Sequence, residues 1–285
     1  MIPAAFDYVR PSSVDEAVSA LGAAGEDGKV LAGGQSLIPV LRLRLAYPTT
    51  LIDVGRIAEM QGVRDDGDAI VIGAMTAHHD VLHDSLVHEH APLIAQATQT
   101  VADPQVRHRG TFGGSLAHAD PAGDLGAVAL ALECEFVASG PGGERRIAAA
   151  DFFQDYLTTA LAPDEVLTQI RVPKLGAGWS SHYEKFNRVA QAWSIVGVAA
   201  LVRRNNGAIA EARIGLTNMG STPLRATAAE AALAGADAAS DAVMAAAEHA
   251  ADGTNPPSDL SGQADYRTHL AKVLTKRAVL AAVGN

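Results

Sequence analysis

The spacing of hydrophobic and polar residues divides the first 55 residues into short strands and amphipathic helices. The predicted strands cover residues 6–9, 29–32 and 50–54, and the predicted helices cover residues 14–21 and 37–45. Ser13 and Glu16 match a capping box, in which a hydroxyl and a carboxylate satisfy free backbone amides at the start of a helix. This order of elements predicts a small β-α-β-α-β unit.

After residue 57 the pattern becomes that of an antiparallel sheet accompanied by helices. The predicted strands cover residues 69–72, a hairpin at 135–146, and residues 166–172, 181–186, 193–202 and 208–216. The predicted helices cover residues 78–90 after a capping Thr76, then 92–101, 125–132, 151–156, 227–233, 240–251 and 265–282. A three-stranded sheet backed by a helical layer predicts a separate C-terminal domain.

Two pairs of adjacent glycines stand at positions where a loop leads into a helix. Gly33 and Gly34 follow a predicted strand, and Gly113 and Gly114 come about 80 residues later. Glycine has no Cβ atom, so backbone amides in such a loop can converge on a phosphate at the start of the next helix. An ordinary tight turn would explain one pair, but two pairs favour a nucleotide site.

A Rossmann-type NAD site is the first alternative for the loop at Gly33. Asp53 follows Gly33 by 20 residues, which is the distance of the acidic ribose contact in that fold. The glycines are adjacent, however, and no third glycine completes the required spacing. The sequence therefore favours Asp53 as a capping residue at the end of a strand.

The composition limits which kinds of partner the protein can bind and in which cellular compartment we expect it. The net charge of -10 and the pI near 5.4 argue against non-specific nucleic-acid binding. No apolar run reaches the roughly 18 residues that span a bilayer, and the first residues lack the pattern of a signal peptide, so we expect a cytoplasmic protein. Cys134 is the only cysteine, which excludes a self-contained iron-sulfur cluster, and its apolar surroundings predict a buried, inert thiol.

Metal and hydrolase sites are less well supported. His79 and His83 have the i, i+4 spacing of metal ligands, but no HExxH pattern accompanies them, which favours a solvated helix face. His118 and Asp120 could contribute to a metal site, whereas carboxylates near amide-rich loops suit ribose or ribityl hydroxyls, and Asp124 could also cap a helix. The glycines form no G-x-S-x-G elbow, so no catalytic triad is predicted.

Six motifs give the chain a resemblance that runs almost end to end. They are the opening residues 2–11, AGGQSLIPVLRLRLA (32–46), ADPQVRHRGTFGGSLAHADPAGDL (102–125), YEKFNRVAQAW (183–193), IGLTN (214–218) and ADYRTHLAKVLTKRA (264–278). The chain resembles the medium, flavin-binding subunits of molybdenum hydroxylases, and most closely those of aerobic carbon monoxide dehydrogenases.

The resemblance implies an α+β fold with two domains. Residues 1–176 would form a vanillyl-alcohol-oxidase (PCMH)-type FAD-binding domain, built of α/β subdomains at about 1–55 and 56–176. Residues 177–285 would form a C-terminal flavoprotein domain of three antiparallel strands and a helical layer. FAD would lie between the two domains.

The resemblance also implies a set of FAD contacts and no catalytic or metal-binding side chain. The expected pyrophosphate loops comprise Ala32, Gly33, Gly34, Gln35, Ser36 and Leu37, then Thr111, Phe112, Gly113, Gly114 and Ser115. The other expected contacts are Ala102, with His118 and Asp124 at the ribityl and adjoining groups, and Leu167, Lys185 and Trp193 bordering the isoalloxazine. Trp193 stands where the family has a tyrosine and could stack on the ring; Leu167 and Trp193 as core residues, and Lys185 as a salt-bridge residue, are the alternatives.

Three positions depart from the carbon monoxide dehydrogenase pattern. Gln35 replaces a histidine, Ser115 an asparagine, and Ala192 an aspartate that precedes the aromatic residue. Loss of the carboxylate at 192 bears on how the flavin edge is tuned and which oxidant it serves, and leaves FAD binding untouched.

The expected role is an electron relay within a complex. Electrons from a molybdenum cofactor on a large subunit would pass through [2Fe-2S] clusters of a small subunit to this FAD, and then to a quinone or another acceptor. The resemblance implies a dimer of heterotrimers, which could dock at the inner face of the membrane. A complex for another substrate, such as an aldehyde, xanthine or a nicotine-like heterocycle, a free-standing FAD oxidase and a scaffold module without redox role are the alternatives.

Overall fold

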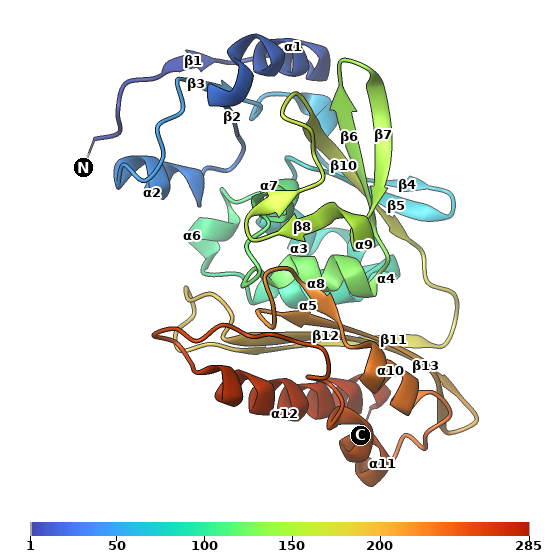
Figure 1. Ribbon diagram of the computed structural model, residues 1–285. Coiled ribbons are helices and arrows are strands. Elements are labelled where there is room, and N and C mark those ends of the chain that lie inside the picture. Colours follow the sequence, from blue (N-terminus) through green and yellow to red (C-terminus); the bar gives the residue numbers. More distant parts are fainter. Residues whose placement is uncertain (1, 285) are drawn as a thin grey trace.

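A computed structural model describes residues 2–284 and shows three β-sheets of three or more strands and one two-stranded sheet (Figure 1). A small sheet with its two helices lies at one end, and a larger sheet and a layer of helices lie in the middle. The third sheet follows, with its own helices on the outer side. The helical layer therefore separates the two larger sheets, which places it at the centre of the molecule.

The first sheet is parallel, in the order β1-β3-β2. Its elements are β1 (Asp7–Val9), α1 (Val14–Ala24), the 3-10 turn η1 (Gly25–Asp27), β2 (Gly28–Leu31), α2 (Leu37–Arg42) and β3 (Thr50–Asp53). This confirms the predicted β-α-β-α-β unit, and the Ser13 hydroxyl caps α1 by accepting from the Glu16 amide. The helix predicted at 37–45 ends at Arg42, because Arg44 adopts a left-handed conformation with φ of 57°.

The second sheet is antiparallel, in the order β4-β5-β10-β6-β7. The strands are β4 (Val63–Asp66), β5 (Ala69–Gly73), β6 (Glu135–Gly140), β7 (Gly143–Ala148) and β10 (Val166–Pro173), and η2 (Ala58–Met60) precedes them. The prediction of a helix at 151–156 is wrong. The helix α9 (Ala149–Phe152) ends at Phe152, and the chain continues into a hairpin of β8 (Phe153–Asp155) and β9 (Thr158–Thr159).

Six short helices connect β5 to β6. They are α3 (His78–His83), α4 (Ser85–His90), α5 (Pro92–Gln99), α6 (Pro104–Arg107), α7 (Phe112–His118) and α8 (Asp124–Ala131). The single helix predicted after Thr76 is divided at Asp84, whose carboxylate caps α4. Thr76 is not the cap of α3, since its hydroxyl donates to the carbonyls of Gly62 and Gly73 instead.

Helix α8 joins the two halves of the molecule. All eight of its residues are buried, in keeping with a sequence that is apolar after Asp124, and it packs against the third sheet. A Cβ atom at Gly215 would lie 2.1 Å from the carbonyl oxygen of Ala127, so a glycine in that strand lets sheet and helix approach closely. The residue before α8, Gly123, occupies the cap position predicted for Asp124.

The C-terminal part has a four-stranded antiparallel sheet where three strands were predicted. Its strands are β11 (Trp179–Phe186), β12 (Val196–Asn205), β13 (Ala208–Thr217) and the short β14 (Leu224–Arg225), in that order across the sheet. The extra strand has only two residues, too few for a pattern to reveal. Helices α10 (Thr227–Leu233), α11 (Ser240–Ala247) and α12 (Ala264–Val283) follow as expected. Among the described residues, no helix has the length and apolar character to span a membrane.

Candidate functional site

The two glycine loops touch each other, although about 80 residues separate them in the sequence. A Cβ atom at Gly33 would lie 2.2 Å from the carbonyl oxygen of Arg109 and 2.8 Å from Cα of Gly110. A Cβ atom at Gly114 would lie 3.2 Å from the Cβ of Ala32. Both glycines are therefore required for close approach, and the pair forms one continuous backbone surface.

The first loop carries unused hydrogen-bond donors. Within residues 2–284, the backbone N–H groups of residues 33–36 donate to no acceptor, and Ile38 is the first amide of this segment to be bonded, to the carbonyl of Gly34. Gly34 has φ of 75°, a conformation that favours glycine, and the Gln35 amide folds back onto the Gly33 carbonyl. Consecutive free amides at the start of a helix are a ready site for an anion.

The second loop is held by hydrogen bonds within the loop and to the neighbouring segment at residues 74–76. The Thr111 hydroxyl accepts from the Gly114 amide, and the Ser115 hydroxyl donates to the Phe112 carbonyl. The amide of Gly113 donates to the carbonyl of Ala74, against which the glycine packs without room for a Cβ. The second loop thus supports the first.

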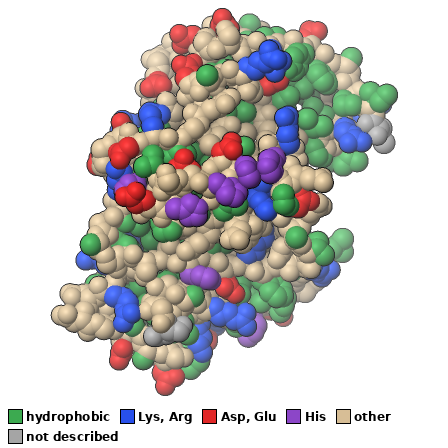
Figure 2. Space-filling view, turned by 180° about the vertical axis from the view of Figure 1, so that it is seen from behind, with side chains coloured by type: hydrophobic (Ala, Val, Ile, Leu, Met, Phe, Trp, Pro, Cys, Tyr) green, Lys and Arg blue, Asp and Glu red, His purple; other side chains and the backbone are tan. Residues whose placement is uncertain are grey.

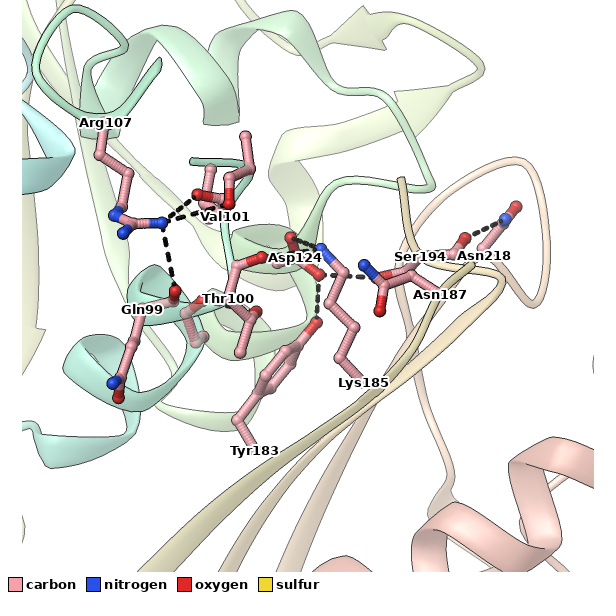
Figure 3. A network of polar contacts seen from close by, with 12 residues as sticks. Gln99, Thr100, Val101, Arg107, Asp124, Tyr183, Lys185, Asn187, Ser194 and Asn218 are labelled. Atoms are coloured by element: carbon pink, nitrogen blue, oxygen red, sulfur yellow. Dashed lines mark hydrogen bonds and ion pairs between the residues drawn. The ribbon is translucent and has the colours of Figure 1, made fainter. Parts of the chain in front are cut away.

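A buried ion pair lies at the start of α8 (Figure 3). The ammonium of Lys185 is 2.8 Å from the carboxylate of Asp124, and each side chain is only 4% exposed. The same carboxylate accepts from the hydroxyl of Tyr183 at 2.8 Å and from that of Ser194 at 2.6 Å. Burial, and next the Asp124 charge, raise the pKa of Tyr183 well above its usual value, so the phenol stays a donor.

Lys185 and Ala102, both predicted FAD contacts, line the same hollow of about 300 Å³. Lys185 also donates to the carbonyl of Thr100 at 3.1 Å. The Arg107 guanidinium donates to the carbonyls of residues 99, 101 and 102, and so secures the left-handed turn at Ala102, whose φ is 43° (Figure 3). Glu184 lines the same hollow as Lys185, and the Lys185 ammonium is turned away to its buried partners, so the hollow has a mixed polar lining and a fixed backbone rim.

The predicted contacts His118 and Trp193 also meet. Their ring centroids are 6.3 Å apart, and Trp193 is 52% exposed, so the interpretation of Trp193 as a core residue is wrong. Burial lowers the pKa of His118, partly offset by the charge of Asp120. Leu167 is buried in the core of the second sheet, next to Thr168, whose carbonyl accepts from the amide of Ala74 beneath the second loop. Leu167 belongs to the same hydrophobic core as Phe112 of the second loop, so the interpretation of Leu167 as a core residue is confirmed.

Tyr183, Ser194 and Asn218 carried no role in the sequence interpretation, although Tyr183 and Asn218 lie within its motifs and Ser194 directly follows one. Tyr183 and Lys185 are two residues apart on a strand, so they share one face, which was a usable signal. Ser194 and Asn218 come from segments that only the fold brings together, and no spacing could reveal them.

The structure gives Cys134, the surface histidines and Asp53 no part in the site described above. Cys134 is 1% exposed, as predicted, and burial raises the pKa of its thiol. The ring of His79 lies between those of His83 and His108, with centroids 4.4 and 3.9 Å away, and Figure 2 shows several histidines on that face. Among residues 2–284, no group of three or more His, Cys, Asp or Glu is arranged to hold a metal ion. Asp53 accepts from the amide of Gly55, which confirms its capping role.

Comparisons with known proteins identify the family. Residues 4–175 match the FAD binding domain in molybdopterin dehydrogenase, and residues 181–282 match the CO dehydrogenase flavoprotein C-terminal domain. The chain belongs to this FAD-binding family. The carbon monoxide dehydrogenase medium chain of Hydrogenophaga pseudoflava is 44% identical, over 99% of this chain and 98% of the relative. The 6-hydroxypseudooxynicotine dehydrogenase complex subunit alpha of Paenarthrobacter nicotinovorans is 34% identical, over 99% and 96%.

A solved structure supports the same family. The carbon monoxide dehydrogenase from Hydrogenophaga pseudoflava that lacks the Mo-pyranopterin moiety of its cofactor superposes with a TM-score of 0.97, at 46% identity, covering 99% of each chain. The chain is thus an FAD-dependent oxidoreductase subunit of the molybdenum enzymes. The interlocked glycine loops with free amides fit a dinucleotide pyrophosphate, and the exposed ring of Trp193 fits a planar flavin.

A buried histidine next to the second loop makes the free energy of unfolding depend on pH. The ring of His78 packs against Gly110, and burial, and next the charge of Arg107, lower its pKa from 6.5 to about 4. Since the folded-state pKa is depressed, the folded chain binds fewer protons than the unfolded chain below pH 6.5. The contribution of His78 to the free energy of unfolding therefore has its full value above pH 6.5, and it falls by about 3 kcal/mol as the pH drops to 4.

Urea unfolding of the full chain between pH 7 and pH 4 measures this loss. His78→Gln should flatten the profile, and the exposed His269→Gln should leave it as in the wild type. An unchanged profile in His78→Gln would assign the acid sensitivity to other groups.

Proposed function

We propose that this chain is the FAD-carrying electron-transfer subunit of a molybdenum hydroxylase complex of the carbon monoxide dehydrogenase type. The observation that carries the proposal is the interlocking of the two glycine loops, which leaves the amides of residues 33–36 free beside a rigid support. The near-full-length similarity to carbon monoxide dehydrogenase medium chains favours that complex over others. The domain division at residues 176 and 177 is part of the proposal.

The proposed roles follow from the geometry of the chain's own residues. The amides of residues 33–36 hold the pyrophosphate, and the second loop keeps them in place. Trp193 presents its exposed ring to the flavin, and Lys185, whose ammonium is paired with Asp124, lines the hollow beside Ala102. His118 and Asp124 border the ribityl region, and Leu167 supports the sheet behind the loops. When bound, FAD accepts electrons singly and in pairs, so no general acid or base is needed here.

The partners in this proposal are a small subunit with [2Fe-2S] clusters and a large subunit with the molybdenum cofactor, as a dimer of heterotrimers. With one cysteine, the chain cannot hold such a cluster itself. Exposed apolar side chains gather on the N-terminal part, as Figure 2 shows, with Leu43 at 61%, Leu45 at 72% and Tyr47 at 65%. A patch of this kind is typical of a protein interface. The complex would lie in the cytoplasm or at the inner membrane face, and reduce a quinone or another acceptor.

The test is purification of the tagged chain from its own cells. The expected result is a flavin absorbance spectrum, one FAD per chain, co-purification of a cysteine-rich subunit and a molybdenum subunit, and bleaching of the flavin by carbon monoxide. An assembly bleached only by an aldehyde or a heterocycle would assign another substrate. Absence of flavin, or reduction of the isolated chain by a small organic substrate, would overturn the proposal.

A further inference from the structure

The two residues after Trp193 have their backbone polar groups hydrogen-bonded, while the ring of Trp193 is half exposed. The buried Ser194 donates its hydroxyl to Asp124, and its amide donates to the carbonyl of Ala122 at 3.4 Å. The carbonyl of Ser194 accepts from the side-chain amide of Asn218 at 2.8 Å. Ser194 is thus bonded through its N–H, its C=O and its hydroxyl.

The following residue is equally constrained. The amide of Ile195 donates to the carbonyl of Phe186 at 2.8 Å, and its carbonyl accepts from the guanidinium of Arg267, which is completely buried. Two consecutive residues therefore have all their backbone polar groups satisfied by elements far apart in the sequence. Such over-determination fixes the point from which the side chain of Trp193 projects.

Trp193 itself projects from this anchored backbone toward His118. The ring is half exposed, and its Cζ3 atom would be 3.8 Å from a Cβ atom at Gly123. Gly123 thus leaves ordinary contact distance beside the ring. An exposed aromatic ring on a rigid base loses little conformational entropy when it stacks on a planar ligand.

Asn218 supplies the hydrogen bond to the Ser194 carbonyl. It adopts a left-handed conformation with φ of 61°, is 7% exposed, and donates its backbone amide to the carbonyl of Pro121 at 2.7 Å. Asparagine tolerates this conformation, and the resulting turn directs its side chain at Ser194 (Figure 3). No other described contact to the Ser194 carbonyl replaces that donor.

We propose that Asn218 and Ser194 are positioning residues, which hold Trp193 as a fixed stacking surface for the flavin ring. The inference rests on the proposed function, because the flavin is the planar ligand concerned. Neither residue needs to touch the flavin. Their effect reaches it through the backbone of residues 193–194 and the orientation of the Trp193 ring.

The variant Asn218→Gly tests the first step in the full chain. Glycine adopts the left-handed conformation without steric strain, so the variant keeps the turn and removes the buried side chain that donates to Ser194. A Trp179→Phe background leaves Trp193 as the single tryptophan, since the chain has two. We expect a clear increase in the fast loss of Trp193 fluorescence anisotropy. The matched control is Asn206→Gly, at another left-handed asparagine, with φ of 49°, in the distant turn between β12 and β13.

The second step is a double-mutant cycle on FAD affinity in the assembled complex. Asn218→Gly should weaken FAD binding roughly three- to tenfold, the size of one buried hydrogen bond. In a Trp193→Ala background the same change should have no effect, because the ring through which Asn218 acts is gone. Unchanged anisotropy, or an equal loss of affinity in both backgrounds, would overturn the inference. A wild-type assembly without flavin would refute the proposed function and with it the stacking role, and the anisotropy comparison would still decide whether Asn218 positions the ring of Trp193.

Discussion

Replacing Gly33 with alanine should abolish FAD retention. The added Cβ atom would lie 2.2 Å from the carbonyl oxygen of Arg109 and 2.8 Å from Cα of Gly110, both backbone atoms that no rotamer change can move away. The loops must separate, and the free amides of residues 33–36 lose the surface that aligns them. We expect a loss of about 4 kcal/mol in FAD binding, on the order of a thousandfold. The measurement is the FAD content of the purified assembly, followed by titration with FAD.

The matched control is Gly22→Ala. Gly22 lies in α1 with no atom within 4 Å of its added Cβ, and alanine there should stabilise the helix by roughly 0.5–1 kcal/mol and leave the flavin in place. Circular dichroism and a melting curve show whether Gly33→Ala remains folded. Stoichiometric flavin in Gly33→Ala would contradict the assignment of these loops to the pyrophosphate.

Local chemistry in the sequence was enough to predict the loops. Adjacent glycines before a helix restrict the possible structures strongly, and the parallel unit around them follows from its hydrophobic spacing. What could not be predicted was that Gly33 faces Arg109 and Gly110, since that contact depends on how the first sheet and its loop pack against the connection between α6 and α7. The end of α2 at Arg42 was missed because the apolar spacing continues to Leu45, which the structure leaves 72% exposed.

The polar network at Asp124 is a second case in which local sequence patterns cannot predict contacts between distant segments. Helix capping was the local alternative for Asp124, but the fold presents Tyr183, Lys185 and Ser194 to its carboxylate. These partners are 59 to 70 residues away, so no local pattern encodes them. The salt-bridge role considered for Lys185 is confirmed, and its burial could not be read from a strand with mixed polarity.

Replacing Lys185 with methionine should destabilise the whole chain. The substitution leaves the Asp124 carboxylate buried, with two hydroxyl donors and no positive charge beside it. Removing one partner of a buried ion pair costs about 3–5 kcal/mol, because the remaining charge has lost its water and its counter-ion. Methionine has a similar length and apolar stem, so lost packing adds little. Urea unfolding of the full chain at pH 7 measures the change in the free energy of unfolding.

Lys174→Met provides the comparison, since Lys174 is 2.7 Å from Asp65 in a pair whose carboxylate is half exposed. That variant should lose less than about 1 kcal/mol, because water screens the pair. Adding Asp124→Asn to Lys185→Met removes the unpaired charge and should recover a large part of the loss. Equal losses in the two lysine variants, or no recovery in the double variant, would mean that Lys185 stabilises this junction by packing instead of charge. The ordering of the three variants therefore measures how strongly one buried ion pair joins α8 to the C-terminal sheet.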